Sequence, residues 1–312
     1  MVNLILFFKG FIVGIAFIIP GVSGGTLAVY LGVYKKFLDS ISNLFTEFKK
    51  SVYFLIPFLF GALVSVLALA KLFAILIEWN SFIVLLFFIG LLMGGIKHLY
   101  LKSGVKKINI SALLSLVIAF FILLTIIIID KTKTTTIVAN FDLDIVSYLL
   151  IIGLGIISVT TMIVPGISGS AMLMVLGYYT AIVSNVIGNI TDFSNFSYNI
   201  QVLIFYIIGM VIGLFVFSRI ISFLLEKYPK QTYFAILGFV LASIIGVFLE
   251  IRNPNTATNY EEQIPVYKDI FTYIQDNILI VIIGVIIFAG GYITTKYLTK
   301  LEKSEEVNNE SL

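Results

Sequence analysis

A short stretch rich in proline and glycine occurs twice in this chain, each time inside a long apolar segment. The first copy, residues 19–26, has the sequence IPGVSGGT, and the second, residues 164–171, has VPGISGSA, 145 positions later. Proline removes a backbone donor and glycine weakens a helix, so each copy should interrupt one. In hydrocarbon a freed peptide group finds no water, and such a break is tolerated only around a polar cavity. The paired copies therefore predict two broken helices at a binding site, as in transporters built from repeats.

The composition places these segments in a membrane. Hydrophobic residues make up 60% of the 312 residues, charged residues make up 12%, and the mean hydropathy is +1.09. In soluble domains, hydrophobic residues make up roughly one half of the chain and charged residues roughly one quarter. We therefore expect an all-α polytopic membrane protein. Six segments approach or exceed the length of about 20 residues that a span needs: 52–77, 81–97 with its flanks, 110–129, 201–225, 232–249 and 278–295.

The two remaining apolar segments, 4–38 and 145–183, carry the Pro-Gly copies near their centres. Each copy leaves arms of about 15 residues, which are short for spanning at 1.5 Å per residue. Each segment is therefore either a re-entrant hairpin or one broken crossing.

The positions of the lysines distinguish these alternatives, because cytoplasmic loops collect Lys and Arg. If both broken segments enter and leave on the same side, the outer loops hold only Lys131, Lys133, Arg252 and Lys268. A crossing second segment would change the count from thirteen against four to ten against seven. We therefore predict a re-entrant second hairpin and cytoplasmic termini, while the course of the first hairpin is less constrained. The thirteen cytoplasmic lysines are then Lys35, Lys36, Lys49, Lys50, Lys97, Lys102, Lys106, Lys107, Lys227, Lys230, Lys296, Lys300 and Lys303.

Further matches extend the repeat beyond the two copies. At an offset of 148, Gly61, Lys71, Glu78 and Gly90 correspond to Gly209, Arg219, Glu226 and Gly238. Such correspondence indicates an internal repeat. We predict two inverted repeats, each a re-entrant broken-helix hairpin followed by three transmembrane helices. The first repeat is 1–129 (hairpin 4–38, spans 52–77, 81–97 and 110–129), followed by a connector 130–144, a second repeat 145–300 (hairpin 145–183, spans 201–225, 232–249 and 278–295) and a disordered tail 301–312.

The hairpin tips are the first candidate binding site. Where a helix restarts, its first N–H groups lack intrahelical partners and carry the positive end of the helix dipole, and glycine allows a close approach. We therefore expect these residues to bind an anion. The alternative is that small residues only permit tight helix packing. The residues concerned are Ser23, Gly24, Gly25 and Thr26 in the first copy and Ser168, Gly169 and Ser170 in the second.

Charged residues within the spans are the second candidate set. Lys71 and Arg219 occupy matching positions, and a cation inside a span costs a few kcal/mol unless it has a partner or a function. We expect both to bind the same anion. Glu78 and Glu226 follow seven residues later on the same helix faces, where they serve either in ion coupling or in a structural ion pair. Tyr34 and Tyr179, which end the outgoing arms, fit anchoring in an aromatic belt.

Other functional classes find no support. The G-x-S-G pattern of an intramembrane serine protease occurs twice, but a nucleophilic serine needs a base, and His98 is the one histidine. There is no cysteine, and without clustered ligands we expect no metal and no cofactor. The basic residues form no stripe with interleaved aromatics, which argues against nucleic acid. We therefore do not expect an enzyme.

The motif Pro20-Gly-Val-Ser-Gly-Gly-Thr26, its partner Pro165-Gly-Ile-Ser-Gly-Ser170 and the chain length resemble the bacterial polyprenyl-phosphate transporters. These are the undecaprenyl phosphate translocases of the PopT type, formerly a domain of unknown function. The resemblance covers about residues 1–300. It implies a protein of the bacterial cytoplasmic membrane that returns undecaprenyl phosphate from the outer to the cytoplasmic leaflet, so that the carrier is reused for peptidoglycan and other cell-envelope polymers. The second copy has Ser170 and Ala171 in place of Gly25 and Thr26, so the two tips need not contribute equally.

The expected partners are therefore a polyprenyl phosphate and membrane lipid, with a proton or sodium as a possible coupling ion and with no oligomeric state implied. A secondary transporter of a small soluble anion or ion is the alternative, because the same repeat logic allows it. A membrane-facing slot between the halves, wide enough for a prenyl chain, would favour the lipid; a closed aqueous vestibule would favour the soluble ion.

Overall fold

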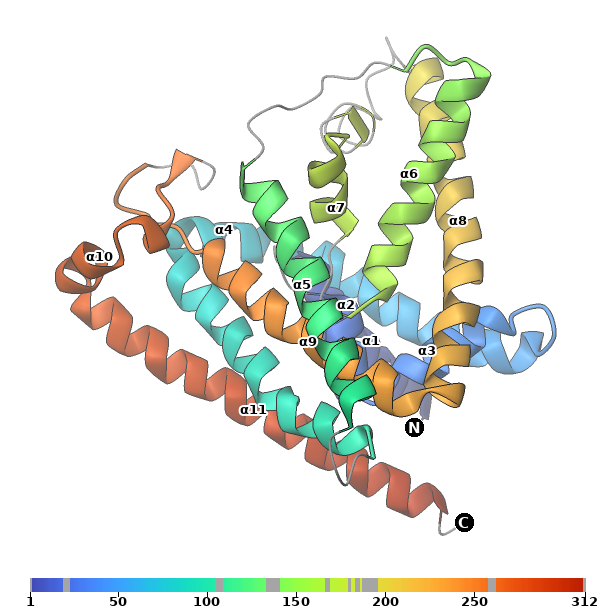
Figure 1. Ribbon diagram of the computed structural model, residues 1–312, viewed down its shortest axis with the longest axis horizontal. Helices are drawn as coiled ribbons and strands as arrows, with labels where there is room; N and C mark the ends of the chain where they lie inside the picture. Colours follow the sequence, from blue (N-terminus) through green and yellow to red (C-terminus); the bar gives the residue numbers. More distant parts are fainter. Residues whose placement is uncertain are drawn as a thin grey trace.

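The computed structural model describes residues 2–18, 23–104, 109–132, 141–165, 169–178, 181–182, 186, 196–257 and 262–310. Within these ranges the secondary structure is helical apart from one isolated bridge between Arg252 and Pro265. Figure 1 shows the helices, which are α1 (Val2–Ile18), α2 (Gly24–Tyr30), α3 (Tyr34–Ser42), α4 (Phe48–Lys102), α5 (Ile110–Thr132), α6 (Ile145–Ile163), α7 (Gly169–Leu176), α8 (Phe196–Lys227), α9 (Pro229–Leu249), η3 (Val266–Lys268), α10 (Ile270–Asp276) and α11 (Ile278–Glu310).

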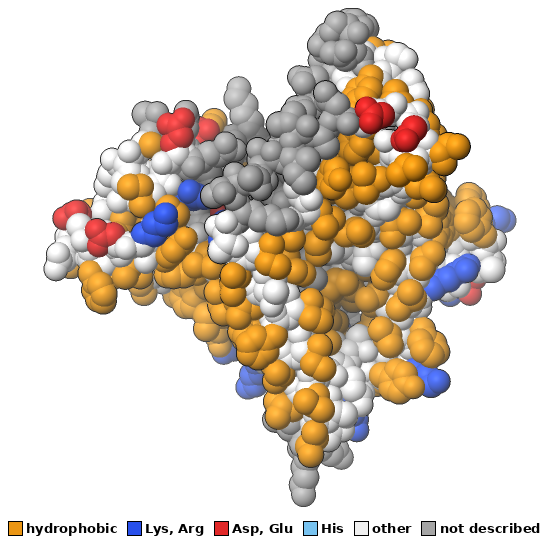
Figure 2. Space-filling model, turned by 45° about the horizontal axis from the view of Figure 1, so that its top comes forward, with side chains coloured by type: hydrophobic (Ala, Val, Ile, Leu, Met, Phe, Trp, Pro, Cys, Tyr) orange, Lys and Arg blue, Asp and Glu red, His pale blue; other side chains and the backbone are white. Residues whose placement is uncertain are grey.

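Six helical segments are long and apolar enough to cross a membrane, which confirms the predicted polytopic all-α class. Their outward faces are apolar, and Figure 2 shows hydrophobic side chains over much of the visible surface, with charged side chains mainly toward its edges. The segments are Phe48–Leu69, Ile75–Lys102, Ile110–Ile129, Phe196–Lys227, Pro229–Leu249 and Ile278–Lys300.

The first two segments belong to α4, which bends at Asn80. This residue has extended backbone angles (φ −163°, ψ 92°), and its side-chain carbonyl accepts a hydrogen bond from the backbone N–H of Ile83 at 3.2 Å. That bond satisfies one of the free donors that a helix start leaves. Asn80 therefore ends one arm of α4 and caps the next, and the two arms point in different directions in Figure 1.

Glycines bring α1 against the first arm of α4, and α6 against α8, in the same way. A Cβ on Gly10 would lie 1.9 Å from the carbonyl oxygen of Phe58, and a Cβ on Gly155 would lie 2.3 Å from that of Tyr206. Gly10 and Gly155 are 145 positions apart, and their partners Phe58 and Tyr206 are 148 positions apart. These are the two offsets of the sequence repeat. Neither helix pair tolerates a side chain at its glycine, because the backbones themselves are in contact.

A second pair of matching glycines packs on the last helix of the other half-chain. A Cβ on Gly90 in α4 would meet the carbonyl oxygen of Phe288 in α11 at 2.1 Å, and one on Gly238 in α9 would meet that of Leu116 in α5 at 2.2 Å. The two half-chains therefore exchange their final helices, and neither half packs as an isolated unit.

Both Pro-Gly copies interrupt a helix, as predicted. In the first, α1 ends at Ile18, and Ser23 precedes α2 with extended angles (φ −99°, ψ 127°). In the second, α6 ends at Ile163, followed by Val164 with φ −70° and ψ 119°. Residues 19–22 and 166–168, including Ser168, lie outside the described residues. The returning helices α2 and α7 are each followed by a glycine in the left-handed region, Gly32 (φ 67°) and Gly177 (φ 86°), a conformation that favours glycine.

The segment expected to be a disordered tail differs from the prediction. Helix α11 continues through Glu310, well beyond residue 301. The residues 301–310 include Leu, Glu and Lys, which favour helix, and extending an existing helix avoids the cost of nucleation. The expected connector 130–144 is also shortened at its start, because α5 reaches Thr132.

Alanine at Gly155 should destabilise the protein, and alanine at Gly153 should not. A Cβ at Gly153 meets nothing within 4 Å, whereas one at Gly155 meets the backbone of α8. We expect Gly155→Ala to lower the free energy of unfolding by about 1–3 kcal/mol, the cost of overpacking. Gly153→Ala should leave it unchanged or raise it by up to about 1 kcal/mol through helix propensity. Thermal unfolding of the two purified variants measures the difference, and equal melting temperatures would contradict the close packing of α6 on α8.

Candidate functional site

The two interrupted helices meet at their breaks. A Cβ on Gly25, at the start of α2, would lie 2.9 Å from the carbonyl oxygen of Ile163 and 3.3 Å from the Cα of Pro165. These residues belong to the two Pro-Gly copies or adjoin them, although they are far apart in the sequence. The close approach requires glycine at position 25, because any side chain would separate the tips.

Tyr34 adds a hydrogen bond to this meeting point. Its hydroxyl donates to the carbonyl of Ile163 at 3.0 Å, and the residue is only 4% exposed. The bond satisfies a carbonyl at the end of α6, where a helix leaves its last acceptors free. The interpretation of Tyr34 as an interfacial anchor is therefore wrong. Tyr34 and Tyr179 are 145 positions apart, the same offset as the two Pro-Gly copies, and this match could have indicated a structural role for Tyr34. Tyr179 itself lies outside the described residues.

Two hydroxyl groups at the first tip are buried without a partner. Ser23 is 3% exposed and Thr26 is 0% exposed, and among the described residues neither side-chain oxygen has a hydrogen-bond partner. A buried polar group without a partner costs about 1–3 kcal/mol. Such groups are retained where a ligand or water completes their bonding. The predicted anion site therefore coincides with unused hydrogen-bonding capacity at Ser23 and Thr26.

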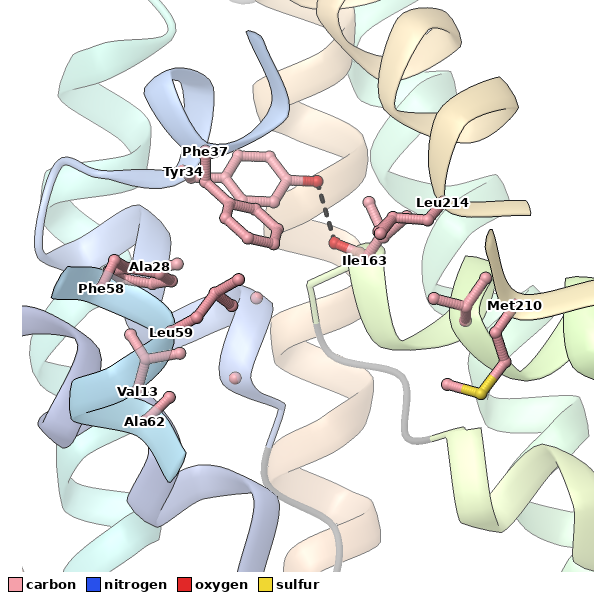
Figure 3. Close-up of a pocket in the computed structure, with 13 residues that line it drawn as sticks. Val13, Ala28, Tyr34, Phe37, Phe58, Leu59, Ala62, Ile163, Met210 and Leu214 are labelled. Atoms are coloured by element: carbon pink, nitrogen blue, oxygen red, sulfur yellow. Dashed lines mark hydrogen bonds between the residues drawn. The ribbon is translucent and has the colours of Figure 1, made fainter. Parts of the chain in front are cut away.

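An apolar crevice of about 140 Å³ reaches this tip at Gly24 and Gly25, which lie between Ser23 and Thr26 in the sequence. Figure 3 shows it between residues of the first arm of α4 on one side and Met210 and Leu214 of α8 on the other. Leu59 in its wall is 50% exposed, so the crevice reaches the outer surface of the protein, which is expected to face lipid. Its lining residues are Val13, Gly24, Gly25, Ala28, Tyr34, Phe37, Phe58, Leu59, Ala62, Val159, Ile163, Met210 and Leu214.

Arg219 lies away from this crevice, whose described lining does not include it. Its side chain is exposed, and its guanidinium donates to the carbonyl of Ser42, the last residue of α3, from Nε at 3.4 Å and from Nη2 at 3.3 Å. A cation at this position also complements the negative end of the α3 dipole. Lys71 belongs to α4, but its side chain lies outside the described residues.

The two acidic candidates lie in different surroundings. Glu226 forms an ion pair with Lys35 of α3, with 3.2 Å between Nζ of the lysine and Oε1 of the glutamate. Glu78 is exposed beside the bend of α4, where it lines a cavity of about 530 Å³ with Trp79 and Asn80. A structural ion pair was one of the roles expected for Glu226, but the sequence did not identify Lys35 as the partner, because Lys35 is distant in the chain.

The second tip is described less completely. Gly169 and Ser170 begin α7, but nothing is described of the Ser170 side chain or of Ser168. Among the described residues, no group of three or more His, Cys, Asp or Glu side chains is placed to hold a metal ion.

Comparison with known proteins identifies a family and two relatives. A family profile described as "Undecaprenyl phosphate translocase-like" matches residues 13–263. A protein of Staphylococcus aureus named "Polyprenyl-phosphate transporter" is 31% identical over 245 residues, which cover 77% of this chain and 84% of that protein. A protein of Vibrio cholerae serotype O1 with the same name is 29% identical over 252 residues, covering 76% of this chain and 75% of that one. No solved structure matches the chain.

The fold and the site define a polytopic helical membrane protein in which two interrupted helices meet at the end of a lipid-facing crevice. The matched profile covers well over half of the sequence. The chain belongs to the undecaprenyl phosphate translocase-like family.

Proposed function

We propose that this protein carries a polyprenyl phosphate across the membrane, with the phosphate at the hairpin tips and the isoprenoid chain in the apolar crevice. One observation carries the proposal: the apolar crevice is lined by Gly24 and Gly25, and their neighbours Ser23 and Thr26 carry buried hydroxyls that have no partner among the described residues. A phosphate monoester bears roughly −1.5 to −2 charges near neutral pH and requires a polar path, whereas its isoprenoid tail does not. The apolar lining favours this cargo over a small soluble anion.

Inverted repeats are part of the proposal. Successive glycine contacts advance along both helices of each pair. Helix α1 therefore runs in the same direction as the first arm of α4, and α6 runs in the same direction as α8. The end of α8 contacts α3, which precedes the start of α4. The start of α4 and the end of α8 therefore lie on one side, so the two helix pairs run in opposite directions. This supports two re-entrant hairpins that approach from opposite faces.

Positive charge along the path of the headgroup is proposed to come from Lys71 and Arg219, although Arg219 is not among the described residues that line the crevice. The partner that the structure gives Arg219 is a neutral carbonyl, so that bond does not cancel its positive charge. Ser168, Gly169 and Ser170 are proposed to complete the phosphate contacts from the second tip. Glu78 and Glu226 are proposed as coupling or ion-pairing residues for a proton or sodium gradient.

The orientation of the protein in the membrane follows in this proposal from the lysine-rich side. The residues of α3 and the end of α8 are among those expected on the cytoplasmic face of a bacterial cell membrane. Rocking of the halves would expose the tips alternately to the two leaflets and return the carrier from the outer to the cytoplasmic leaflet for cell-envelope synthesis.

Purified protein in liposomes should translocate labelled undecaprenyl phosphate, and we expect Lys71→Gln and Arg219→Gln to reduce the rate. The loss for each variant should be about tenfold or more, corresponding to roughly 1.4 kcal/mol of lost stabilisation of the charged headgroup. Repeating the measurement with and without a pH gradient tests proton coupling. A wild-type rate equal to that of empty liposomes would refute the proposed function. Wild-type rates for both variants would remove the two cations from the site.

A further inference from the structure

Helix α3 joins the two half-chains through four polar contacts. Tyr34, at its start, bonds the end of α6 beside the tips, as described above. Further along, Lys35 pairs with Glu226, Asp39 accepts a hydrogen bond from the Ser222 hydroxyl at 2.8 Å, and the carbonyl of Ser42 accepts from Arg219. The last three contacts all reach α8. Helix α3 therefore leads from the tips along α8, and its last three contacts form what we call the α3–α8 latch.

A polar cavity of about 400 Å³ lies beside the latch. Three lysines and three carboxylates line it: Lys35, Lys36, Lys50, Asp39, Glu47 and Glu226. This is the reverse of the crevice at the tips, which is apolar. A charged headgroup leaving the tips along α3 would therefore arrive among charged side chains, three of them lysines.

The cations of this cavity are held weakly enough to change partners. The side chains of Lys35 and Glu226 are 52% and 62% exposed, and those of Lys50 and Glu47 are 79% and 50% exposed. Ion pairs at such exposure contribute little stability. Lys36 lies 5.4 Å from the centre of the Phe54 ring, a contact with a neutral group, and it forms no salt bridge with the described residues. A phosphate monoester, with more charge than a carboxylate, can replace these partners at small cost.

We propose that this cavity is a second binding site for a phosphate monoester, and that Lys35 binds the phosphate there by releasing Glu226. This inference rests on the proposed function and extends it. Exchange at Lys35 breaks one of the three contacts that hold α3 to α8, so arrival of the headgroup weakens the latch. The site thereby couples delivery of the headgroup on this face to separation of the half-chains.

Cross-linking across the latch tests the proposal, and the absence of native cysteine makes the labelling specific. Asp39→Cys and Ser222→Cys replace two residues whose side chains are in hydrogen-bond contact, and a short, reducible bis-methanethiosulfonate can bridge them. We expect bridging to stop lipid translocation and reduction to restore it, each measured against the same protein before treatment. Each single-cysteine variant is the control for modification without bridging. Bridged protein that translocates at its untreated rate would overturn the latch while leaving the proposed function intact, provided that wild-type protein translocates.

The rate of bridging tests the phosphate site. Farnesyl phosphate should slow bridging of the double-cysteine protein about fivefold, the effect expected for one exposed charged contact, whereas farnesol should not. Adding Lys35→Gln should remove this effect, and Lys49→Gln, an exposed lysine outside the cavity lining, should retain it. If inorganic phosphate also slows bridging, the site binds the anion alone; slowing by farnesyl phosphate only assigns it to the lipid headgroup. The proposal would be overturned if neither farnesyl phosphate nor inorganic phosphate changed the bridging rate, or if the slowing persisted after Lys35→Gln.

Discussion

Replacing Ser23 by alanine and Thr26 by valine together is expected to lower lipid translocation by about 100-fold, because each hydrogen bond to a charged group contributes about 1.5–3 kcal/mol. Both hydroxyls are buried at the first tip, and within the described part of the chain neither has a partner. Valine keeps the shape of threonine, so the substitution removes a hydrogen-bonding group and little else. The rate is measured in liposomes containing equal amounts of folded protein.

The same double variant should not be less stable than the wild type. Removing a buried hydroxyl without a partner relieves a desolvation cost, so the free energy of unfolding should stay the same or rise by about 1 kcal/mol. A residue that only supports the fold would show the opposite result. Opposite changes in transport and stability are therefore the signature of a binding role.

Thr295→Val is a matched control for this experiment. Thr295 in α11 is 1% exposed, and its hydroxyl is likewise without a partner among the described residues, but it does not line the crevice. This variant should share any gain in stability and translocate at the wild-type rate. Normal transport by the Ser23 and Thr26 double variant would place the phosphate elsewhere.

The sequence predicted the six spans and the two helix breaks because both depend on local composition. Hydropathy over a window of about 20 residues marks a span, and proline with glycine marks an interruption. The glycine correspondences at offset 148 also appear as contacts, since Gly90 and Gly238 each pack on the last helix of the other half. Such close packing depends on the glycine itself and is visible in the sequence.

The partners of the charged residues could not be predicted in this way. Arg219 was expected beside the tips because of its position within a span, but the prediction did not include a separate helix α3 whose final carbonyl lies within reach. Lys35 and Glu226 are 191 residues apart, and no local pattern connects them. Tyr34 was assigned to the interface because tyrosine is common there, whereas a free carbonyl at the end of α6 fixes its actual position.

A tryptophan at Met210 should block the lipid path itself. The Met210 side chain lines the crevice across from the first arm of α4 (Figure 3), and a space of about 140 Å³ leaves little room for both an indole ring and a prenyl chain. We expect Met210→Trp to reduce undecaprenyl phosphate translocation at least about tenfold, or roughly 1.4 kcal/mol in the barrier. Met210→Ala, which enlarges the crevice, should retain transport.

Val211→Trp distinguishes a block of the crevice from the general effect of placing a large side chain on α8. Val211 is the next residue and is 46% exposed toward the expected lipid face, where tryptophan meets only acyl chains. Its translocation rate should therefore stay close to that of the wild type, and both variants should unfold at similar temperatures. If Met210→Trp translocates as fast as Val211→Trp, the prenyl chain does not pass between α4 and α8. If Met210→Trp alone fails while its folded yield is normal, the lipid tail passes through the crevice, as the proposed function requires.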